Sequence, residues 1–220
     1  MMSRPVTRLI RIVDDDPTLA ASLAFMLEVA GCRVKSYPDA QHFLAYDDAT
    51  QPGCVLLDVR MPKMSGLELQ RVMAARKLRL PLVFLSAHGD IEMAMDCVKA
   101  GAVDFIVKPP RADKLLNAIE RACGRDAALR ALQAEARECA ALWAAVTGPE
   151  EEAGALLAKG LSNKEIARLL GVGEDAVRSR RASLYAKLDV RNVAELAELL
   201  YARADLRARL SALGLTPEGE

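Results

Sequence analysis

A few acidic side chains and one lysine each follow directly after a short apolar run. They are Asp14, Asp15, Asp58 and Lys108. Carboxylate oxygens suit a hard divalent cation, and a lysine ammonium can offset charge on a phosphoryl group. If the apolar runs are neighbouring strands, the sequence predicts a single pocket for a metal ion and a phosphoryl group.

Strand and helix patterns alternate over residues 7–122, and this alternation would position the four side chains. The apolar runs are 10–13, 32–36, 55–57, 82–85 and 103–107, each followed by a helical pattern. Short apolar strands with little alternation are typical of a parallel sheet covered on both faces. We therefore expect an α/β domain with a doubly wound, five-stranded parallel sheet. Ligands of such sheets bind at the carboxyl ends of the strands, where Ser86 also falls.

Residues 123–145 form a second region, rich in alanine, arginine and glutamate, which predicts a long linker helix. Six residues recur at spacings of three and four, as in a heptad seam: Leu129, Leu132, Ala136, Cys139, Trp143 and Val146. Two interpretations remain open. The seam packs on the chain's own domains, or it pairs with a second copy of the chain.

Residues 146–206 read as a small domain of short helices, followed by a tail at 207–220. Ser162 and Glu165 form a predicted capping box, and a glycine turn at 171–173 leads into a basic helix at 174–188. Two helices joined by a tight turn, the second one basic, indicate a helix-turn-helix. The side chains expected to contact DNA are Lys164, Arg178, Arg180, Arg181 and Lys187.

The composition limits the other possibilities. Of the 220 residues, 52% are hydrophobic and 27% are charged, which is ordinary for a globular protein. No apolar run reaches the length of a membrane span, so we expect a cytoplasmic protein without a membrane partner. Five scattered cysteines indicate reduced, buried thiols. The net charge is +0, so DNA binding would depend on a local basic patch.

The motifs together resemble two-component response regulators of the FixJ (NarL/LuxR-type) family. The resemblance is carried by residues 12–16, 57–66, 86–90 and 99–109 in the first domain, and by residues 160–188 in the second. It implies a flavodoxin/CheY-like receiver, a helical linker and an all-α LuxR-type helix-turn-helix domain.

The resemblance also implies a role for individual residues. Asp58 is similar to the phosphoryl acceptor, and Lys108 to its phosphoryl partner, with a cis bond before Pro109. Mg²⁺ would be held by Asp14, Asp15, Asp58 and the backbone carbonyl of Arg60. Ser86 and Phe105 take the places of the switch residues. Arg60 and His88 would set the lifetime of the phosphoryl group.

The implied function is a phosphorylation-activated DNA-binding transcriptional regulator. Its partners would be a sensor histidine kinase, double-stranded promoter DNA, RNA polymerase and, on phosphorylation, a second copy forming a homodimer. We expect no enzyme, because a phosphatase with Asp58 as nucleophile needs a second carboxylate two residues on, where Arg60 stands. A receiver with a protein-interaction or phosphoryl-sink output stays an alternative. The first DNA-binding helix departs from the family pattern, and Gly154 stands at a core position, costing about 1 kcal/mol in helix propensity plus lost packing.

Overall fold

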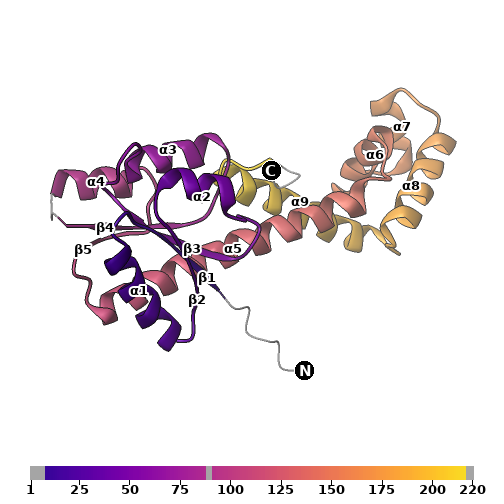
Figure 1. The fold of residues 1–220 in the computed structure, drawn as a ribbon. Helices are drawn as coiled ribbons and strands as arrows, with labels where there is room; N and C mark the ends of the chain where they lie inside the picture. Colours follow the sequence, from indigo (N-terminus) through magenta and orange to yellow (C-terminus); the bar gives the residue numbers. More distant parts are fainter. Residues whose placement is uncertain (1–7, 88–90, 217–220) are drawn as a thin grey trace. The chain divides into compact units, whose positions relative to one another are not determined.

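The structure is a computed structural model that describes residues 8–87 and 91–216. The chain divides into two compact units, Met1–Leu129 and Arg130–Glu220 (Figure 1). One helix, α5 (Ala112–Trp143), begins in the first unit and ends in the second. Among the described residues, no helix has the length and hydropathy to cross a bilayer.

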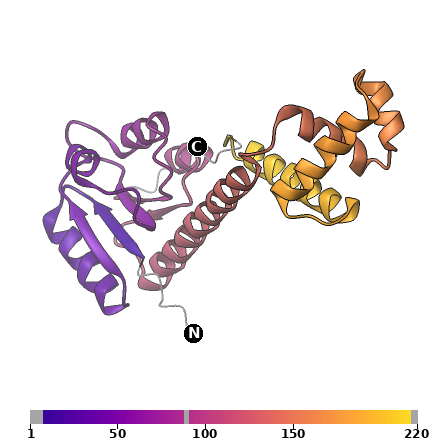
Figure 2. The same ribbon diagram turned by 90° about the vertical axis from the view of Figure 1, so that its right-hand side faces the viewer.

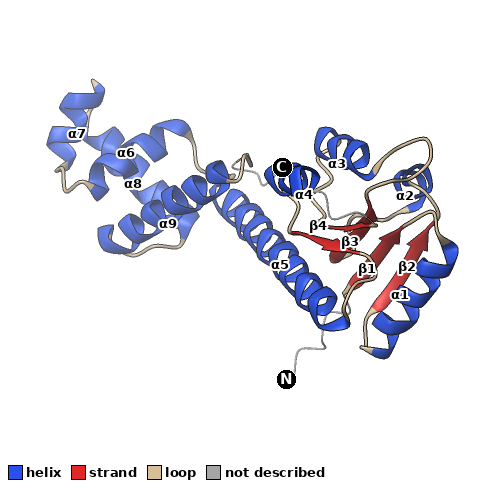
Figure 3. Cartoon of the chain, turned by 90° about the vertical axis from the view of Figure 1, so that its left-hand side faces the viewer, coloured by secondary structure: helices blue, strands red, loops and turns tan. Residues whose placement is uncertain are grey.

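The first unit is built on a five-stranded parallel sheet in the described part of the chain (Figure 3). Its strands are β1 (Leu9–Val13), β2 (Arg33–Tyr37), β3 (Gly53–Asp58), β4 (Leu82–Ser86) and β5 (Asp104–Val107), in the order β2-β1-β3-β4-β5. Every neighbouring pair is parallel, which confirms the predicted doubly wound sheet. The register pairs Val13 with Leu57 and Ser86 with Val107, so the strands end along one edge.

Helices cover both faces of this sheet, which explains why its strands are apolar on both sides. On one face lie α1 (Pro17–Val29) and the first part of α5, and on the other lie α2 (Ala40–Tyr46), α3 (Gly66–Ala75) and α4 (Ile91–Lys99) (Figure 1). Each face has its own apolar core. The two cores hold the sheet rigid, and its edge becomes a fixed platform for polar side chains.

Two helix starts lie beside this edge and are capped by side chains. Asp16 caps α1 by accepting hydrogen bonds from the backbone N–H groups of Thr18 and Leu19, at 2.9 and 3.1 Å. Ser65 caps α3 and forms a capping box with Glu68. Such caps satisfy N–H groups that have no partner within the helix. Asp16 is therefore occupied as a cap, while Asp14 and Asp15 precede the helix.

A buried arginine in β1 was not anticipated from the apolar pattern. Arg11 is fully buried, and its Nε lies 2.8 Å from Asp47 Oδ2. Its Nη2 donates to the backbone carbonyls of Asp48 and Gln51, at 2.7 and 3.0 Å. The guanidinium thus bonds the loop before β3 to β1. These contacts lie at the end of the sheet away from the acidic side chains.

The second unit contains α6 (Gly148–Ala158), α7 (Asn163–Leu170), α8 (Glu174–Leu188) and α9 (Val193–Ala212) around one apolar core. Ile166, Val177, Leu184 and Leu196 are fully buried in it. Gly171 ends α7 with a positive φ of 64°, which lets the chain turn sharply into α8. The predicted pair of helices and its glycine turn are therefore present.

The segment predicted as a tail, 207–220, is helical as far as Ala212. Leu210 and Leu215 are buried there, as is Leu206 directly before the segment. The end of α5 is likewise buried at Leu132, Ala136 and Trp143. Figure 2 shows α5 as one uninterrupted helix.

Side chains of α9 contact the end of α5 directly. Arg209 Nη2 lies 3.1 Å from Glu135 Oε2, and the Arg203 guanidinium lies 4.1 Å from the centre of the Trp143 ring. A small hollow is lined by both helices, including Cys139 and Leu210. The chain's own last helix therefore covers part of the seam of α5. This matches the first of the two interpretations that the sequence left open.

Candidate functional site

The carboxyl edge of the sheet brings together three of the predicted site residues. Asp14 follows β1, Asp58 ends β3 and Lys108 follows β5. Lys108 Nζ lies 2.7 Å from Asp14 Oδ2 and 2.7 Å from Asp58 Oδ1. One ammonium thus bridges two carboxylates that are 44 residues apart in the sequence (58 − 14 = 44). The peptide bond between Lys108 and Pro109 is cis, as the resemblance implied.

A third carboxylate completes an acidic cluster. Asp14, Asp15 and Asp58 each offer an oxygen within 4.8 Å of the others, among the residues that the structure describes. Asp14 and Asp58 are buried, and Asp15 is exposed. Three carboxylates against one ammonium leave an excess of two negative charges. This excess and the all-oxygen donor set fit a divalent cation such as Mg²⁺.

The surroundings of Asp58 disfavour its charged form. Burial raises the pKa of Asp58 above its ordinary value, Lys108 acts in the opposite direction, and the charges of Asp14 and Asp15 raise it further. Burial also opposes the charge on Lys108, but its hydrogen bonds to Asp14 and Asp58 leave the pKa of Lys108 raised. A divalent cation in this pocket would therefore stabilise the charged form of Asp58.

Of the two predicted switch residues, Ser86 lies at the same edge and Phe105 lies two residues before the end of β5. Ser86 ends β4 and is buried, and Phe105 of β5 is half-buried against the core beneath α2, α3 and α4. The Arg60 side chain is exposed. The assignment of its backbone carbonyl as a metal ligand stays a prediction. His88 lies outside the described residues.

Gly66 is a site residue that sequence reasoning missed. It opens α3, and its N–H donates to the Val59 carbonyl at 2.9 Å. A Cβ added to Gly66 would lie 2.2 Å from the backbone oxygen of Asp58, closer than atoms can approach. Only glycine lets α3 start against the end of β3. Its place directly after the Ser65 cap is the sequence signal that could have identified it.

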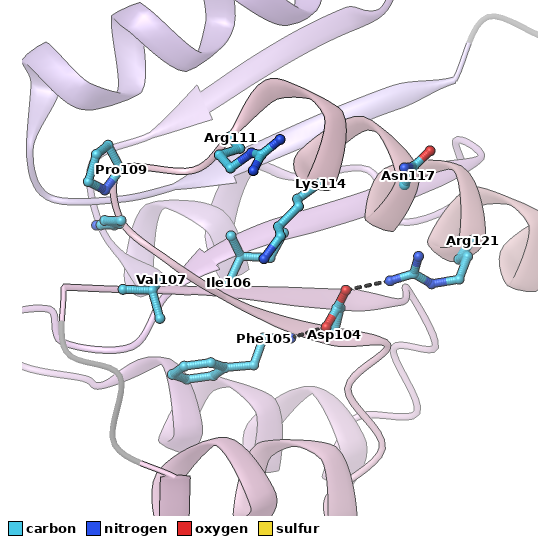
Figure 4. Close-up of a pocket in the computed structure, with 10 residues that line it drawn as sticks. Asp104, Phe105, Ile106, Val107, Pro109, Arg111, Lys114, Asn117 and Arg121 are labelled. Carbon is cyan, nitrogen blue, oxygen red and sulfur yellow. Dashed lines mark hydrogen bonds and ion pairs between the residues drawn. The ribbon is translucent and has the colours of Figure 1, made fainter.

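A groove lies beside Phe105 on β5. Its volume is about 570 Å³, and Phe105, Val107, Lys114 and Arg121 are among its lining residues (Figure 4). Arg121 forms an ion pair with Asp104 across it. The floor is apolar and the α5 rim is cationic. This groove flanks the side chain that the resemblance assigns to the switch.

In the second unit, α8 presents most of its predicted basic side chains outward. Val177, Leu184 and Leu188 face the core, while Arg178 and Arg181 are exposed and Arg180 is half-buried. Arg178 pairs with Asp175 at the start of α8. Lys164, on α7, is exposed as well. The arrangement provides a cationic surface beside the turn of the helix-turn-helix.

Lys187 differs from the other basic residues of α8, because its ammonium is paired with a carboxylate of α6. Its Nζ lies 2.8 and 2.7 Å from the two carboxylate oxygens of Glu150 on α6. Glu150 also accepts from Ser183 Oγ at 2.6 Å and from the Thr147 N–H at 2.8 Å. The side chain turns inward because a buried carboxylate is available there. The assignment of Lys187 as a DNA contact stays a prediction.

The atypical first helix of this domain is formed, and Gly154 does not leave a void. A Cβ on Gly154 would lie 2.5 Å from Leu184 Cδ2, so Leu184 already fills the space. The prediction that Gly154 loses packing in the core was therefore wrong. The missing side chain of α6 is replaced by a closely approaching leucine of α8.

The geometry defines a class of protein: an acidic, lysine-bridged receiver pocket joined to a helix-turn-helix domain. Comparison with known families agrees. The "Response regulator receiver domain" family matches residues 10–120, and the "Bacterial regulatory proteins, luxR family" matches residues 150–200.

Similar proteins extend over most of the chain. The transcriptional regulatory protein FixJ of Rhizobium meliloti is 36% identical over 193 residues, covering 88% of this chain and 95% of that protein. The transcriptional regulatory protein TdiR of Thauera aromatica is 36% identical over 185 residues, covering 84% and 82%. The structure of the response regulator StyR has a TM-score of 0.79 at 37% identity, covering 89% of this chain and 99% of that one. The chain belongs to the FixJ-like response regulators with a LuxR-type DNA-binding domain.

Proposed function

We propose that this protein accepts a phosphoryl group on Asp58 from a sensor histidine kinase and then binds promoter DNA as a homodimer. The observation that carries the proposal is the position of Lys108 Nζ, 2.7 Å from both Asp14 and Asp58. An ammonium held between a nucleophilic carboxylate and a metal-ligand carboxylate is placed to offset charge on a transferred phosphoryl group.

Asp14, Asp15, Asp58 and the Arg60 carbonyl would hold Mg²⁺, which supplies charge neutralisation for phosphoryl transfer when bound. The rest of the chemistry belongs to the protein. Asp58 attacks phosphorus with a carboxylate oxygen, while the bond from phosphorus to the kinase histidine breaks and its electrons stay on that nitrogen. Lys108 keeps its proton throughout, because the neighbouring carboxylates raise its pKa. It can exchange its bond to Asp58 for one to the phosphoryl group.

The signal would leave the pocket through Ser86 and Phe105. Phosphorylation adds about −1.5 to −2 charges and three acceptor oxygens. Ser86 ends β4 beside Asp58, because the register pairs Asp58 with Leu85, the residue before Ser86. If the Ser86 hydroxyl moves to donate to the phosphoryl group, Phe105 can fill the space behind it. That couples the new charge to the outer surface of β5.

The surface of α4, β5 and α5 is the proposed dimer interface. Met95, Val98 and Val107 are large apolar side chains that are exposed there. The groove with Lys114 and Arg121 on its rim lies next to them. Apolar side chains surrounded by charged ones are typical of association surfaces that form on demand.

Lys164, Arg178, Arg180, Arg181 and Lys187 are the proposed DNA contacts, with α8 in the major groove. Most would reach phosphates, and some a base edge. RNA polymerase is the further proposed partner, and the cytoplasm the proposed location, since both kinase transfer and promoter binding take place there. We propose neither a membrane partner nor an enzymatic activity for this protein.

The alternative function, a receiver with a protein-interaction or phosphoryl-sink output and no DNA binding, has less support. It would need a second unit that has lost its fold or its basic face. In this chain α6 is joined to α8 through Glu150 and Lys187, and Arg178 and Arg181 are exposed.

The experiment that tests the proposal uses the full chain. Duplexes are enriched from a random-sequence pool with protein treated with acetyl phosphate and Mg²⁺, and affinity is then measured with and without treatment. We expect tighter binding and a dimer by light scattering only after treatment, and neither change in Asp58→Asn. Equal DNA affinity before and after phosphorylation of Asp58 would contradict the proposal. A phosphorylated protein that dimerises but enriches no duplex would favour the output without DNA.

A further inference from the structure

Three thiols gather in the apolar layer between the sheet and its covering helices. Cys54 of β3 and Cys123 of α5 belong to the same buried core, and Cys32, just before β2, packs against it. Cys54 is 0% exposed, Cys123 is 3% exposed and Cys32 is half-buried. The cluster lies at the start of β3, and Asp58 lies at the other end of the same strand.

Cys54 and Cys123 are in direct contact. Their thiols share a hydrogen bond. This bond, against burial, holds the pKa of Cys123 below its ordinary value, and Arg8 acts in the same direction. The same bond and burial raise the pKa of Cys54. The lowered pKa of Cys123 favours its thiolate, and thiolate is the form that reacts with oxidants.

The contact is held in place by a neighbouring hydrogen bond. Asp126 lies one turn after Cys123 on α5, and its Oδ2 accepts from the N–H of Gly53 at 2.9 Å. Gly53 is the residue before Cys54. Two successive positions of β3 thus meet two positions of α5 that are three residues apart and share a face. This hydrogen bond holds the backbone at Cys54 against the turn of α5 that carries Cys123.

We propose that Cys54 and Cys123 are an oxidation site that closes to an intramolecular disulfide in the presence of a peroxide. The Cys123 thiolate attacks one oxygen of hydrogen peroxide, the O–O bond breaks, and a sulfenic acid and water result after protonation. The Cys54 sulfur then attacks the sulfenic sulfur. The S–S bond forms, the S–O bond breaks, and hydroxide leaves as water with the proton of Cys54. Two thiols and one peroxide give one disulfide and two waters.

The bond would join the strand that ends in Asp58 to the helix that continues past the receiver. It would fix α5 on the sheet at this point and would close the chain between residues 54 and 123. A link across a long segment restricts the unfolded chain, so the oxidised receiver should melt at a higher temperature than the reduced one.

The sequence makes the site easy to map. Cleavage after lysine and arginine places all five cysteines on separate peptides, with Cys54 in 36–60, Cys123 in 122–125 and Cys32 in 12–33. The reduced full-length protein is treated with hydrogen peroxide, its remaining thiols are alkylated, and the unreduced digest is analysed by mass spectrometry. We expect a linked pair of 36–60 with 122–125 that disappears on reduction. A digest with no such pair, or with 12–33 linked to 122–125 in its place, overturns the proposal.

Variants separate a specific link from general oxidation. Cys97 is also 0% exposed but lies in the core on the opposite face of the sheet, so Cys97→Ser is the matched control. We expect Cys97→Ser to keep both the link and the rise in melting temperature on oxidation, and Cys123→Ala to lose both. The peptide map of the unaltered protein decides the question even where a variant folds poorly. An oxidation-dependent rise in melting temperature that survives in Cys123→Ala would contradict the proposed pair.

Discussion

Glu150 on α6 and Lys187 on α8 form an ion pair, with both carboxylate oxygens within 2.8 Å of the ammonium nitrogen. The pair joins the helix that resembles the family least to the helix proposed to enter DNA. Ser183 donates to the same carboxylate, so successive turns of α8 are held by one side chain of α6. The integrity of the DNA-binding unit therefore depends on a charge, and that charge can be titrated.

Acid should weaken the second unit through Glu150. The hydrogen bonds from Lys187, Ser183 and Thr147 lower the pKa of Glu150 from 4.5 to about 2. A depressed carboxyl pKa contributes stability that is present above the unfolded value and is lost as pH falls through the folded value. The window is therefore about pH 4.5 down to about pH 2. The urea midpoint of unfolding, followed by Trp143 fluorescence, should fall as the pH is lowered through this window. In Glu150→Gln the midpoint should depend less on pH.

Trp143 suits this measurement because it is the single tryptophan and is buried in the second unit. Glu152→Gln is the control, since Glu152 is an exposed glutamate two residues further along α6. Its profile should match that of the unaltered protein. Identical pH profiles for Glu150→Gln and the unaltered protein would remove the ion pair from the explanation.

Gly154→Ala should destabilise the second unit although alanine favours a helix. The gain in propensity is about 1 kcal/mol. Against it, the new Cβ would lie 2.5 Å from Cδ2 of the fully buried Leu184, and overpacking a core costs about 1–3 kcal/mol. In a Leu184→Ala background the clash is gone, so Gly154→Ala should there be neutral or stabilising. The unaltered protein, the two single variants and the double variant form a double-mutant cycle, and denaturant unfolding of the four gives the coupling free energy between the two positions. A coupling free energy near zero would contradict the close approach of Leu184 to Gly154.

The covered seam of α5 should depend on the buried leucines of α9. Leu210→Ala is expected to cost about 2–5 kcal/mol, as for other buried leucines. Leu213 is 52% exposed, three residues further on, and Leu213→Ala is the matched control with a small effect. The free energy of unfolding from urea titration measures both. Light scattering on Leu210→Ala also shows whether the uncovered seam pairs with a second copy; equal stability of the two variants would mean that α9 does not cover the seam.

Mg²⁺ should stabilise the first unit through Asp15. Asp15 is exposed and belongs to the acidic cluster, so Asp15→Asn should leave the fold intact and reduce the Mg²⁺-dependent rise in melting temperature. Asp16→Asn is the control, because it removes a neighbouring charge but asparagine still caps α1. The comparison is made by measuring the melting temperatures of both variants and of the unaltered protein at increasing MgCl₂ concentrations. A loss of the Mg²⁺ effect in Asp16→Asn, with Asp15→Asn unaffected, would move the metal site.

The basic face of α8 should set the salt dependence of DNA binding. Removing two phosphate contacts in Arg178→Ala with Arg181→Ala should lower the slope of log affinity against log salt by about 2. Arg33 and Arg71 are exposed arginines of the first unit, and replacing both is the control. Fluorescence anisotropy with a mixed-sequence duplex at several KCl concentrations measures the slopes. An unchanged slope in the α8 variant would place the DNA surface elsewhere.

The sequence predicted the sheet and its edge because parallel strands force their carboxyl ends together. Asp14, Asp58 and Lys108 are found together for that reason, although they are far apart in the sequence. The ion pair between Glu150 and Lys187 could not be predicted in this way. Lys187 is predicted only as a DNA contact, and only the packing of α6 against α8 brings it to Glu150.

Other features also required the tertiary structure. The heptad pattern identified the seam of α5, but an apolar stripe does not specify what covers it, and here the cover comes from α9. The space beside Gly154 is filled by Leu184, a residue whose own position predicted only that it faces inward. Arg11 interrupts an apolar strand, and its partners lie in a loop before β3 that no periodicity describes.

Phosphoryl transfer to Asp58 is the most direct test of the central claim. The full-length protein is incubated with radiolabelled acetyl phosphate, with Mg²⁺ or with EDTA, beside Asp58→Asn and the exposed control Asp48→Asn. We expect label in the unaltered protein and in Asp48→Asn, only with Mg²⁺, and none in Asp58→Asn. Equal labelling of Asp58→Asn, or equal labelling in EDTA, would show that the lysine-bridged carboxylate is not the acceptor.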